Sequence, residues 1–202
     1  MSDGHGTTAT WSGGWWGEAA AVPSPNFGAR PPGEEGCIDL VVLHSISLPP
    51  GEYGGPAVEQ FFTNRLDFDA HPFYAELRGM EVSAHFFLRR DGRLLQFVSC
   101  DERAWHAGVS QWRGRPRCND RSIGIELEGL EGQGFEPVQY AGLERLLRAL
   151  AARYPLRDVV GHEHIAPGRK CDPGPGFDWN ALIKVLSELS LCGPPMLSAA
   201  QG

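Results

Sequence analysis

The stretch Gly161-His-Glu-His-Ile-Ala-Pro-Gly-Arg-Lys-Cys-Asp-Pro-Gly-Pro-Gly-Phe-Asp-Trp179 gathers two histidines, a lysine, a cysteine and three acidic side chains in one segment rich in Gly and Pro. Gly and Pro at this density predict a loop. Loops seldom collect so many side chains able to bind a metal only to expose them to solvent. Val159 and Val160 precede the loop and are typical of the end of a buried strand, so we expect His162 at a strand tip.

The end of this loop is predicted to be extended. Pro173 favours an extended conformation for Asp172 before it, and alternate side chains of an extended chain share a face. Lys170 and Asp172 are therefore predicted to point toward one site, and Cys171 away from it. Together with His162, the stretch offers an imidazole, a carboxylate and an ammonium group to a common site.

The overall composition is that of an ordinary globular protein. The chain has 202 residues, of which 42% are hydrophobic and 21% are charged, which suits one domain with a real core. The formal net charge of −7 argues against general nucleic-acid binding, whose footprint is basic, although it allows a local basic patch. We therefore expect no nucleic-acid partner.

The cysteines and the N-terminus predict a cytoplasmic location. The five cysteines lie far apart and form no Cys-x-x-Cys pair, which favours unpaired thiols in a reducing compartment over a zinc ribbon or a redox dithiol. Residues 1–24 lack the basic segment followed by an apolar one that a secretory signal requires. No apolar run reaches the ~20 residues that span a bilayer, so we expect no membrane partner.

Two strands are predicted to carry polar side chains of interest. Residues 38–43 form a nearly unbroken apolar run, typical of a buried central strand, and His44 closes it. Strand ends are where α/β sheets place ligands, but His44 alone fits a hydrogen-bonded core histidine better. Residues 122–128 alternate and predict a half-buried strand, on which Glu126 shares a face with Gly124 and has room above it. Glu126 then faces solvent or lies over a cavity.

Helices and further strands follow from the spacing of apolar residues. Residues 57–64 predict a short amphipathic helix, and residues 82–98 predict a hairpin with Asp-Gly as a two-residue turn. Leucines at helical spacing predict a helix over residues 137–154. Residues 158–161 return as a strand, and a second helix, capped by its first residue, is expected over 178–191.

The domain boundaries are predicted from composition. Residues 1–22, rich in Gly, Ala, Ser and Thr, are expected to be a flexible N-terminal extension, residues 23–191 a single catalytic domain, and residues 192–202 a C-terminal tail. The tryptophans of the extension either dock onto the domain or belong to a tail peculiar to this chain.

Two further clusters bear on substrate binding. Trp105-His106 is either the anchor of a loop or a wall for a sugar ring, and the sequence favours neither. His85 is expected to pack or to support a site. Residues 111–121 hold four arginines, the one basic concentration in an acidic chain. These arginines either form a solvated surface or bind substrate carboxylates in bidentate fashion.

His44, His162 and Asp172 together offer two nitrogens and one oxygen. Three such ligands with an open fourth position are what catalytic zinc uses. With Lys170 close to Asp172 in sequence and Glu126 on a neighbouring strand, these residues predict a hydrolytic site.

Long, ordered motifs lie in six segments: Val41–Gly51, Val82–His85, Arg103–Ser110, Arg117–Asp120, Ser122–Gly129 and Gly161–Pro175. In these motifs the chain resembles the cytoplasmic AmpD-type amidases of bacterial cell-wall recycling. The wider family includes phage amidase lysozymes and peptidoglycan-recognition proteins. The resemblance runs from about Pro23 to Leu189, most of the chain.

The resemblance implies one zinc ion on His44, His162 and Asp172, with catalytic assistance from Glu126 and Lys170. It implies hydrolysis of the amide between the lactyl group of muramic acid and L-alanine in anhydro-muropeptides. It also implies a monomer with an α+β (mixed α/β) fold, in which helices flank a central mixed β-sheet and no second domain is present.

The resemblance also implies substrate contact by Trp105 and Arg117. Three positions depart from its pattern. Ser45 stands where close relatives tend to carry Asn and Glu81 where they carry a basic residue, and we expect both to line the peptide subsite. His164 stands where relatives often have Asp, which makes it a rival metal ligand, although a supporting or solvent-exposed role is favoured.

Two other functions stay open at this point. One is a non-catalytic peptidoglycan-binding module, although such relatives commonly lack a zinc ligand and all three are present here. The other is a lytic amidase that acts on intact peptidoglycan, which would need an export route.

Overall fold

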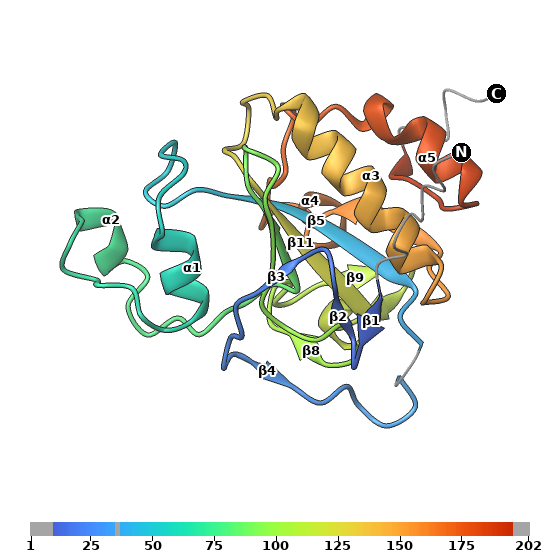
Figure 1. The fold of residues 1–202 in the computed structure, drawn as a ribbon, viewed down its shortest axis with the longest axis horizontal. Coiled ribbons are helices and arrows are strands. Elements are labelled where there is room, and N and C mark those ends of the chain that lie inside the picture. The colour runs from blue at the N-terminus through green and yellow to red at the C-terminus, as the bar shows by residue number, and fades with distance from the viewer. Residues whose placement is uncertain (1–9, 35–36, 196–202) are drawn as a thin grey trace, which may run out of the picture.

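A mixed six-stranded sheet forms the centre of the computed structural model, which describes residues 10–34 and 37–195 (Figure 1). The strands lie in the order β12 (Asp158–Gly161), β5 (Leu40–Ile46), β11 (Ser122–Glu128), β6 (Phe86–Leu88), β7 (Leu94–Gln96) and β3 (Ala20–Ala21). The first four are parallel, β7 is antiparallel to β6, and β3 is parallel to β7. The expected central mixed sheet with flanking helices is confirmed.

Helices and two-residue strands complete the described chain. The helices are α1 (Ala57–Phe62), α2 (Pro72–Ala75), α3 (Pro137–Ala151), α4 (His162–Ile165) and α5 (Ile183–Glu188), with 3₁₀ turns η1 (Cys118–Arg121) and η2 (Trp179–Leu182). The short strands pair as β1 (Trp11–Ser12) with β2 (Trp15–Trp16), β4 (Phe27–Gly28) with β8 (Arg103–Ala104), and β9 (Gln111–Trp112) with β10 (Arg115–Pro116). No described helix has both the length and the apolar character needed to cross a bilayer.

Helices α3 and α5 cover one face of the sheet (Figure 1). Odd-numbered residues of the central strands, such as Val41 and Ile125, pack there with the leucines of α3 in the main apolar core. Burying a side chain of this size contributes about 1.5–3 kcal/mol. The helix predicted over residues 178–191 begins instead as the 3₁₀ turn η2, although the Asp178 side chain caps it as predicted by accepting from the Asn180 N–H.

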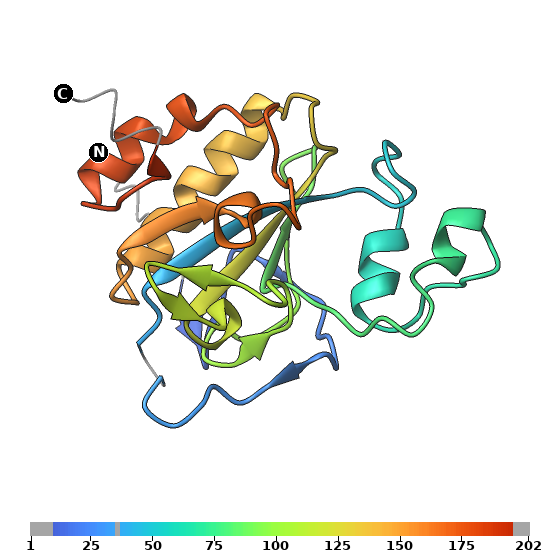
Figure 2. The ribbon, with the colours of Figure 1, turned by 180° about the vertical axis from the view of Figure 1, so that it is seen from behind.

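The opposite face carries the even-numbered residues of the same strands, including His44 and Glu126. Residues 103–121 and helix α4 cover this face (Figure 2). Because this layer lies over the strand, all seven residues of β11 are buried, and the prediction of a half-buried strand is wrong. The room predicted above Gly124 is filled by the His106 ring, since a Cβ at position 124 would lie 2.5 Å from its Cγ.

The hairpin between β6 and β7 turns through three residues, where the sequence predicted two. The Arg89 N–H donates to the Arg93 carbonyl at 2.9 Å, closing the loop one pair beyond the strands. Gly92 has a φ of +85°, a conformation that glycine adopts without strain. This geometry is a turn followed by a glycine bulge, which Asp-Gly also allows.

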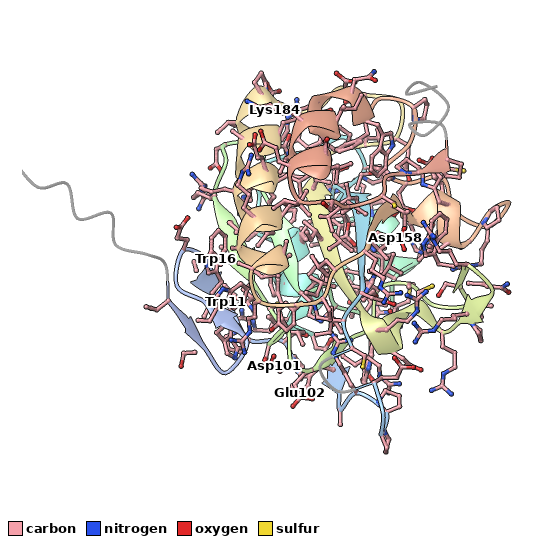
Figure 3. The ribbon with its side chains drawn as sticks, turned by 90° about the vertical axis from the view of Figure 1, so that its right-hand side faces the viewer. Trp11, Trp16, Asp101, Glu102, Asp158 and Lys184 are labelled. Atoms are coloured by element: carbon pink, nitrogen blue, oxygen red, sulfur yellow. The ribbon has the colours of Figure 1, made fainter. Side chains whose placement is uncertain are left out.

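Residues 10–22, expected as part of a flexible extension, pack on the domain. Trp16, on the hairpin of β1 and β2, is 4% exposed within the main core. Trp11 stacks on Trp16 and meets the edge of Tyr154, near one end of α3 (Figure 3). Residues 10–22 are therefore not a flexible extension, and of the two alternatives for the tryptophans the structure shows docking for Trp11 and Trp16, because burial of the indole rings outweighs the Gly-rich composition. Residues 1–9 lie outside the described residues.

The first residue of the predicted C-terminal tail also pairs with the sheet. Cys192 forms a β-bridge with Asp158, and its carbonyl accepts from the Val159 N–H at 2.9 Å. Residues 196–202 lie outside the described residues.

Replacing Trp16 by alanine tests the packing of the N-terminal hairpin. We expect Trp16→Ala to lower the free energy of unfolding by about 3–5 kcal/mol, because it removes a buried aromatic side chain. Trp15→Ala, at a half-buried position of the same strand, is the control and should cost less. Urea unfolding followed by circular dichroism measures both. A Trp16→Ala protein as stable as wild type would show that this hairpin does not pack in solution.

Candidate metal centre and active site

Three parallel strands bring the candidate site together at their carboxyl ends, where open sheets commonly bind ligands. His44 lies near the end of β5, and Glu126 is its register partner on β11. His162 follows directly after β12 as the first residue of α4. Asp172 reaches the same point from the loop beyond α4, so the sheet register fixes three of the four positions.

His44, His162 and Asp172 converge with their donor atoms facing one another. His44 Nδ1 lies 3.0 Å from His162 Nδ1 and 3.0 Å from Asp172 Oδ2, and the two partners are 3.1 Å apart. All three side chains are buried. Among the described residues, this trio is the group of His, Cys, Asp and Glu side chains whose geometry could hold a metal ion.

The contacts on the far side of each ring decide which nitrogens carry protons. His162 Nε2 faces the Ala107 carbonyl at 3.1 Å and therefore donates to it, which leaves His162 Nδ1 with a lone pair. His44 Nε2 faces His106 Nδ1 at 2.9 Å. If His44 Nε2 is the donor in this contact, His44 Nδ1 also keeps a lone pair. His44 Nδ1, His162 Nδ1 and Asp172 Oδ2 then direct lone pairs at one another in a buried space.

This donor set fits zinc. Tetrahedral zinc with ligands at 2.0–2.1 Å places neighbouring ligand atoms about 3.3 Å apart, close to the observed separations of 3.0–3.1 Å. Lone pairs held this close without a cation repel one another. Two nitrogens and one oxygen also match the ligand types of catalytic zinc sites, which keep a fourth position open.

Burial keeps the site in the protonation states that a metal requires. Burial lowers the pKa of His44 to about 4, so its ring is neutral near pH 7. Burial alone would raise the pKa of Asp172, but hydrogen bonds with His162 and His44 outweigh it and hold that pKa well below the usual value. His44 is thus a neutral imidazole and Asp172 a carboxylate, as metal ligands must be.

Glu126 is a buried carboxyl group beside the trio. Its Oε2 has no hydrogen-bond partner within the described residues. Burial raises its pKa well above the usual value, the negative charge of Asp172 adds to this, and the charge of Lys170 opposes it. A carboxylate with a raised pKa is a stronger base than an exposed one.

A cleft of about 290 Å³ opens onto these residues. His44, His162, Asp172, Glu126 and Lys170 line it, together with Trp105 and Ser45. The Ser45 hydroxyl is buried without a partner in the described chain. One wall is largely apolar and combines the end of β5 and the loop after it with the α1–α2 region: Ile46, Leu48, Phe61, Phe73, Leu77 and Met80.

Comparison with known proteins identifies the family. Residues 34–175 match the family model described as N-acetylmuramoyl-L-alanine amidase. This chain belongs to that family. It is 53% identical over 168 residues to the 1,6-anhydro-N-acetylmuramyl-L-alanine amidase AmpD of Salmonella typhimurium, covering 82% of this chain and 89% of that protein.

Solved structures of relatives share the fold. A crystal structure of an AmpD derivative superposes with a TM-score of 0.82 at 48% identity, covering 87% of this chain and 98% of that one. The Escherichia coli amidase AmiD, solved in complex with anhydro-N-acetylmuramic acid-L-Ala-D-γ-Glu-L-Lys, gives a TM-score of 0.53 at 35% identity. That match covers 77% of this chain and 58% of that longer one.

The arginines of this amidase lie elsewhere than the sequence suggested. Arg117 does not line the cleft, and its side chain is 70% exposed and pairs with Asp120. Arg113 pairs with Asp158, while Arg115 and Arg121 pair with Asp39. These last three line a cavity of about 410 Å³ at the amino ends of β5 and β12. Each of them already has a carboxylate partner in its own chain, and the clamp for substrate carboxylates stays a prediction.

In the loop after β12, alternate side chains point into the cleft and away from it. Lys170 and Asp172 line the cleft and Cys171 is exposed outside it, as the alternation predicts. His164 lies outside the metal-binding trio of this amidase. Its Nδ1 accepts from the Gly161 N–H at 2.9 Å, and its ring packs edge-on against Trp179.

Sequence reasoning missed the contacts behind the metal ligands. The sequence allows either a loop anchor or a wall for a sugar ring at Trp105-His106, and it does not predict the contact of 2.9 Å between His106 Nδ1 and His44 Nε2. Asn119, which was given no role, accepts from the backbone N–H groups of His106 and Ala107. The sequence shows a histidine, His106, in a short loop, but it does not show that the partner of this ring is His44, 62 residues earlier.

His85 makes the folded amidase sensitive to acid. Its Nδ1 accepts from the Gly124 N–H at 3.0 Å, which requires a neutral ring, and its Nε2 faces the Glu102 carbonyl. Burial lowers its pKa to about 3, with the Arg30 charge adding to the shift. The unfolded chain therefore binds a proton that the folded chain does not between about pH 6.5 and 3, and stability falls as the pH falls through this range.

Urea unfolding at pH 7, 6 and 5 tests this linkage. His85→Asn keeps an acceptor for the Gly124 N–H but does not titrate. We expect the wild type to lose up to about 1.4 kcal/mol more per pH unit than the variant. Chelator-treated protein is used for both, so that metal release does not contribute. Equal slopes for the two proteins would contradict the assignment of a neutral His85.

Proposed function

We propose that this amidase hydrolyses the amide bond between the lactyl group of muramic acid and L-alanine in anhydro-muropeptides, with one zinc ion on His44, His162 and Asp172. The observation that carries the proposal is the convergence of three lone-pair atoms within 3.1 Å beside a buried, unpartnered Glu126. The sequence similarity to amidases that are named for a 1,6-anhydro-N-acetylmuramyl substrate supports anhydro-muropeptides as the substrate class.

His44, His162 and Asp172 would hold the zinc ion, which would supply Lewis acidity to lower the pKa of a water molecule to about 7 and to polarise a carbonyl group. Glu126 takes the proton that the attacking water loses, because its free oxygen has no competing partner and its pKa is raised. Glu126 then returns a proton to the amine of L-alanine as the C–N bond breaks. The products are a free lactyl carboxylate and a free peptide.

Lys170 lines the same cleft as Glu126 and contributes positive charge to it. As the carbonyl carbon becomes tetrahedral, negative charge grows on its oxygen, and a fixed ammonium group stabilises that charge most in the transition state. Loss of one such group typically costs on the order of a hundred- to a thousandfold in rate. Lys170 is therefore proposed as the second catalytic residue.

Substrate binding is assigned to the cleft. The Trp105 ring offers a flat apolar face, and the buried Ser45 hydroxyl is a free hydrogen-bonding group for a substrate amide. The apolar wall suits the methyl groups of the lactyl and alanyl units. Arg117 stays a predicted substrate contact, and it would have to reach past its ion pair with Asp120.

The proposed recycling role agrees with the cytoplasmic location expected from the sequence, which stays a prediction. The predictions of a monomer, and of no nucleic-acid or membrane partner, stay predictions. Of the alternatives, a non-catalytic binding module would have no use for an unpartnered buried carboxylate beside three metal ligands. A lytic amidase acting on intact peptidoglycan uses the same chemistry, so only the preferred substrate distinguishes it from a recycling amidase.

Peptide release from an anhydro-muramyl tripeptide tests the reaction. We expect release by the zinc-loaded protein, loss of release after chelation, and recovery when zinc returns. Sacculi of intact peptidoglycan serve as the comparison substrate and should be cut far more slowly. No release by zinc-loaded protein would refute the proposed function, and preferential cutting of sacculi would favour the lytic alternative.

Glu126→Gln separates proton transfer from metal binding. We expect turnover to fall by about 10²–10⁴ because the amide cannot accept the proton, while one equivalent of zinc still binds. Glu163→Gln, on α4 but outside the cleft lining, is the matched control and should keep its activity. Normal turnover by Glu126→Gln would remove Glu126 from the mechanism.

A further inference from the structure

Both histidines of the proposed metal centre rest on two consecutive residues of one loop. The His44 Nε2 lies 2.9 Å from His106 Nδ1, and the His162 Nε2 lies 3.1 Å from the Ala107 carbonyl oxygen. These contacts are on the far side of each ring from the metal-facing Nδ1 atoms. A single backbone segment therefore backs two ligands that come from different strands.

The contact with His106 fixes the tautomer of His44. A ligand Nδ1 must carry a lone pair, so the proton of neutral His44 sits on Nε2 and is donated to His106 Nδ1. His106 then carries its own proton on Nε2, which faces the Ser122 hydroxyl at 3.1 Å. The hydrogen bonds run in one direction, from His44 through His106 to Ser122. In each of the two contacts, one atom carries the proton and the other accepts it.

The loop that carries His106 and Ala107 is itself held from both sides. The Asn119 side-chain oxygen accepts from the His106 N–H at 3.2 Å and from the Ala107 N–H at 2.8 Å. On the carbonyl side, the Arg169 guanidinium donates to Ala107 at 2.7 Å and to Val109 at 2.6 Å. The backbone of Asn119 accepts in turn from the buried Arg30 at 3.2 Å.

The sheet leaves no freedom for the His106 ring. The ring lies against the backbone of β11 at Gly124, where any Cβ would approach its Cγ to 2.5 Å. It also meets the His44 ring edge to face, with centroids 5.0 Å apart. Its position is thus set by a glycine on one strand and a metal ligand on the next.

We propose that His106 and Asn119 are positioning residues of the metal centre: Asn119 holds the backbone of residues 106–107, His106 orients His44, and the Ala107 carbonyl orients His162. The inference rests on the metal site of the proposed function. Asn119 does not line the cleft, whereas His106 does, and the role assigned to His106 here is its hydrogen bond to His44. Partners that orient ligand histidines typically contribute 10–100-fold to metal affinity.

Zinc affinity of the metal-free protein, measured in competition with a chromophoric chelator, tests the role of His106. His106→Leu removes the acceptor, and we expect zinc to bind about 10–100-fold more weakly. His106→Asn restores an oxygen near the position of Nδ1 and should recover most of the loss. His164→Asn is the matched control, because His164 lies in the same helix as His162 but contacts no ligand atom, and its affinity should equal that of wild type.

Asn119 gives a second, independent pair of variants. Asn119→Ala removes the shared acceptor, and Asn119→Asp keeps it. We expect weaker zinc binding for alanine and near wild-type binding for aspartate. Thermal unfolding of each metal-free variant, compared with wild type, shows whether the fold is intact. The Asn119 pair decides the question if His106→Leu does not fold.

The absorption spectrum of the Co²⁺-substituted protein reports ligand geometry directly. We expect the d–d bands of His106→Leu and Asn119→Ala to shift from those of wild type, and those of His106→Asn and Asn119→Asp to shift less. If both His106→Leu and Asn119→Ala keep the zinc affinity and the Co²⁺ spectrum of wild type, the positioning role is overturned. The metal site of the proposed function then still stands. A wild-type protein that binds no zinc would overturn the metal site itself, and the inference with it.

Discussion

The structure depends on the close approach of three lone-pair atoms, His44 Nδ1, His162 Nδ1 and Asp172 Oδ2, held 3.0–3.1 Å apart in a buried place. Such atoms repel one another, and water cannot screen the repulsion where side chains are buried. A rigid frame is needed to hold them, and the parallel register of β5 with β11 and β12 supplies it by fixing the backbone at each strand end. The second contact of each imidazole then fixes its rotation.

The same burial explains why the imidazoles around the site stay neutral. His44, His85 and His106 all have lowered pKa values, and burial is the largest cause for each. Each ring also needs at least one unprotonated nitrogen to complete its hydrogen bonds, so charge on any of them would break a contact. Burial raises the pKa of Glu126 by the same physics, since it disfavours the charged form of either kind of group. One apolar environment therefore yields neutral ligands and a stronger base.

Much of the fold was predictable because its signals are local. An apolar run ending in His44, the alternation through Glu126 and the extended Lys170–Asp172 segment each depend on adjacent residues, and the structure places all of them as one cleft. The failures involve partners distant in sequence. The burial of Trp16 depends on the main core, and the pairing of Arg115 with Asp39 spans 76 residues. Composition cannot show that a Gly-rich segment has a core to pack on, or that an arginine already has its own carboxylate.

A comparison of two cavities in the described chain shows which property marks a reactive site. The larger of the two, about 410 Å³, lies among arginines and aspartates, and Arg113, Arg115 and Arg121 each form an ion pair with an aspartate there. The smaller cleft, about 290 Å³, holds a carboxyl oxygen and a hydroxyl without partners beside three lone pairs that face one another. Leaving buried polar groups unsatisfied costs about 1–3 kcal/mol each. A fold that retains several of them in one place, where packing could have removed them, keeps them for a ligand that completes their bonds.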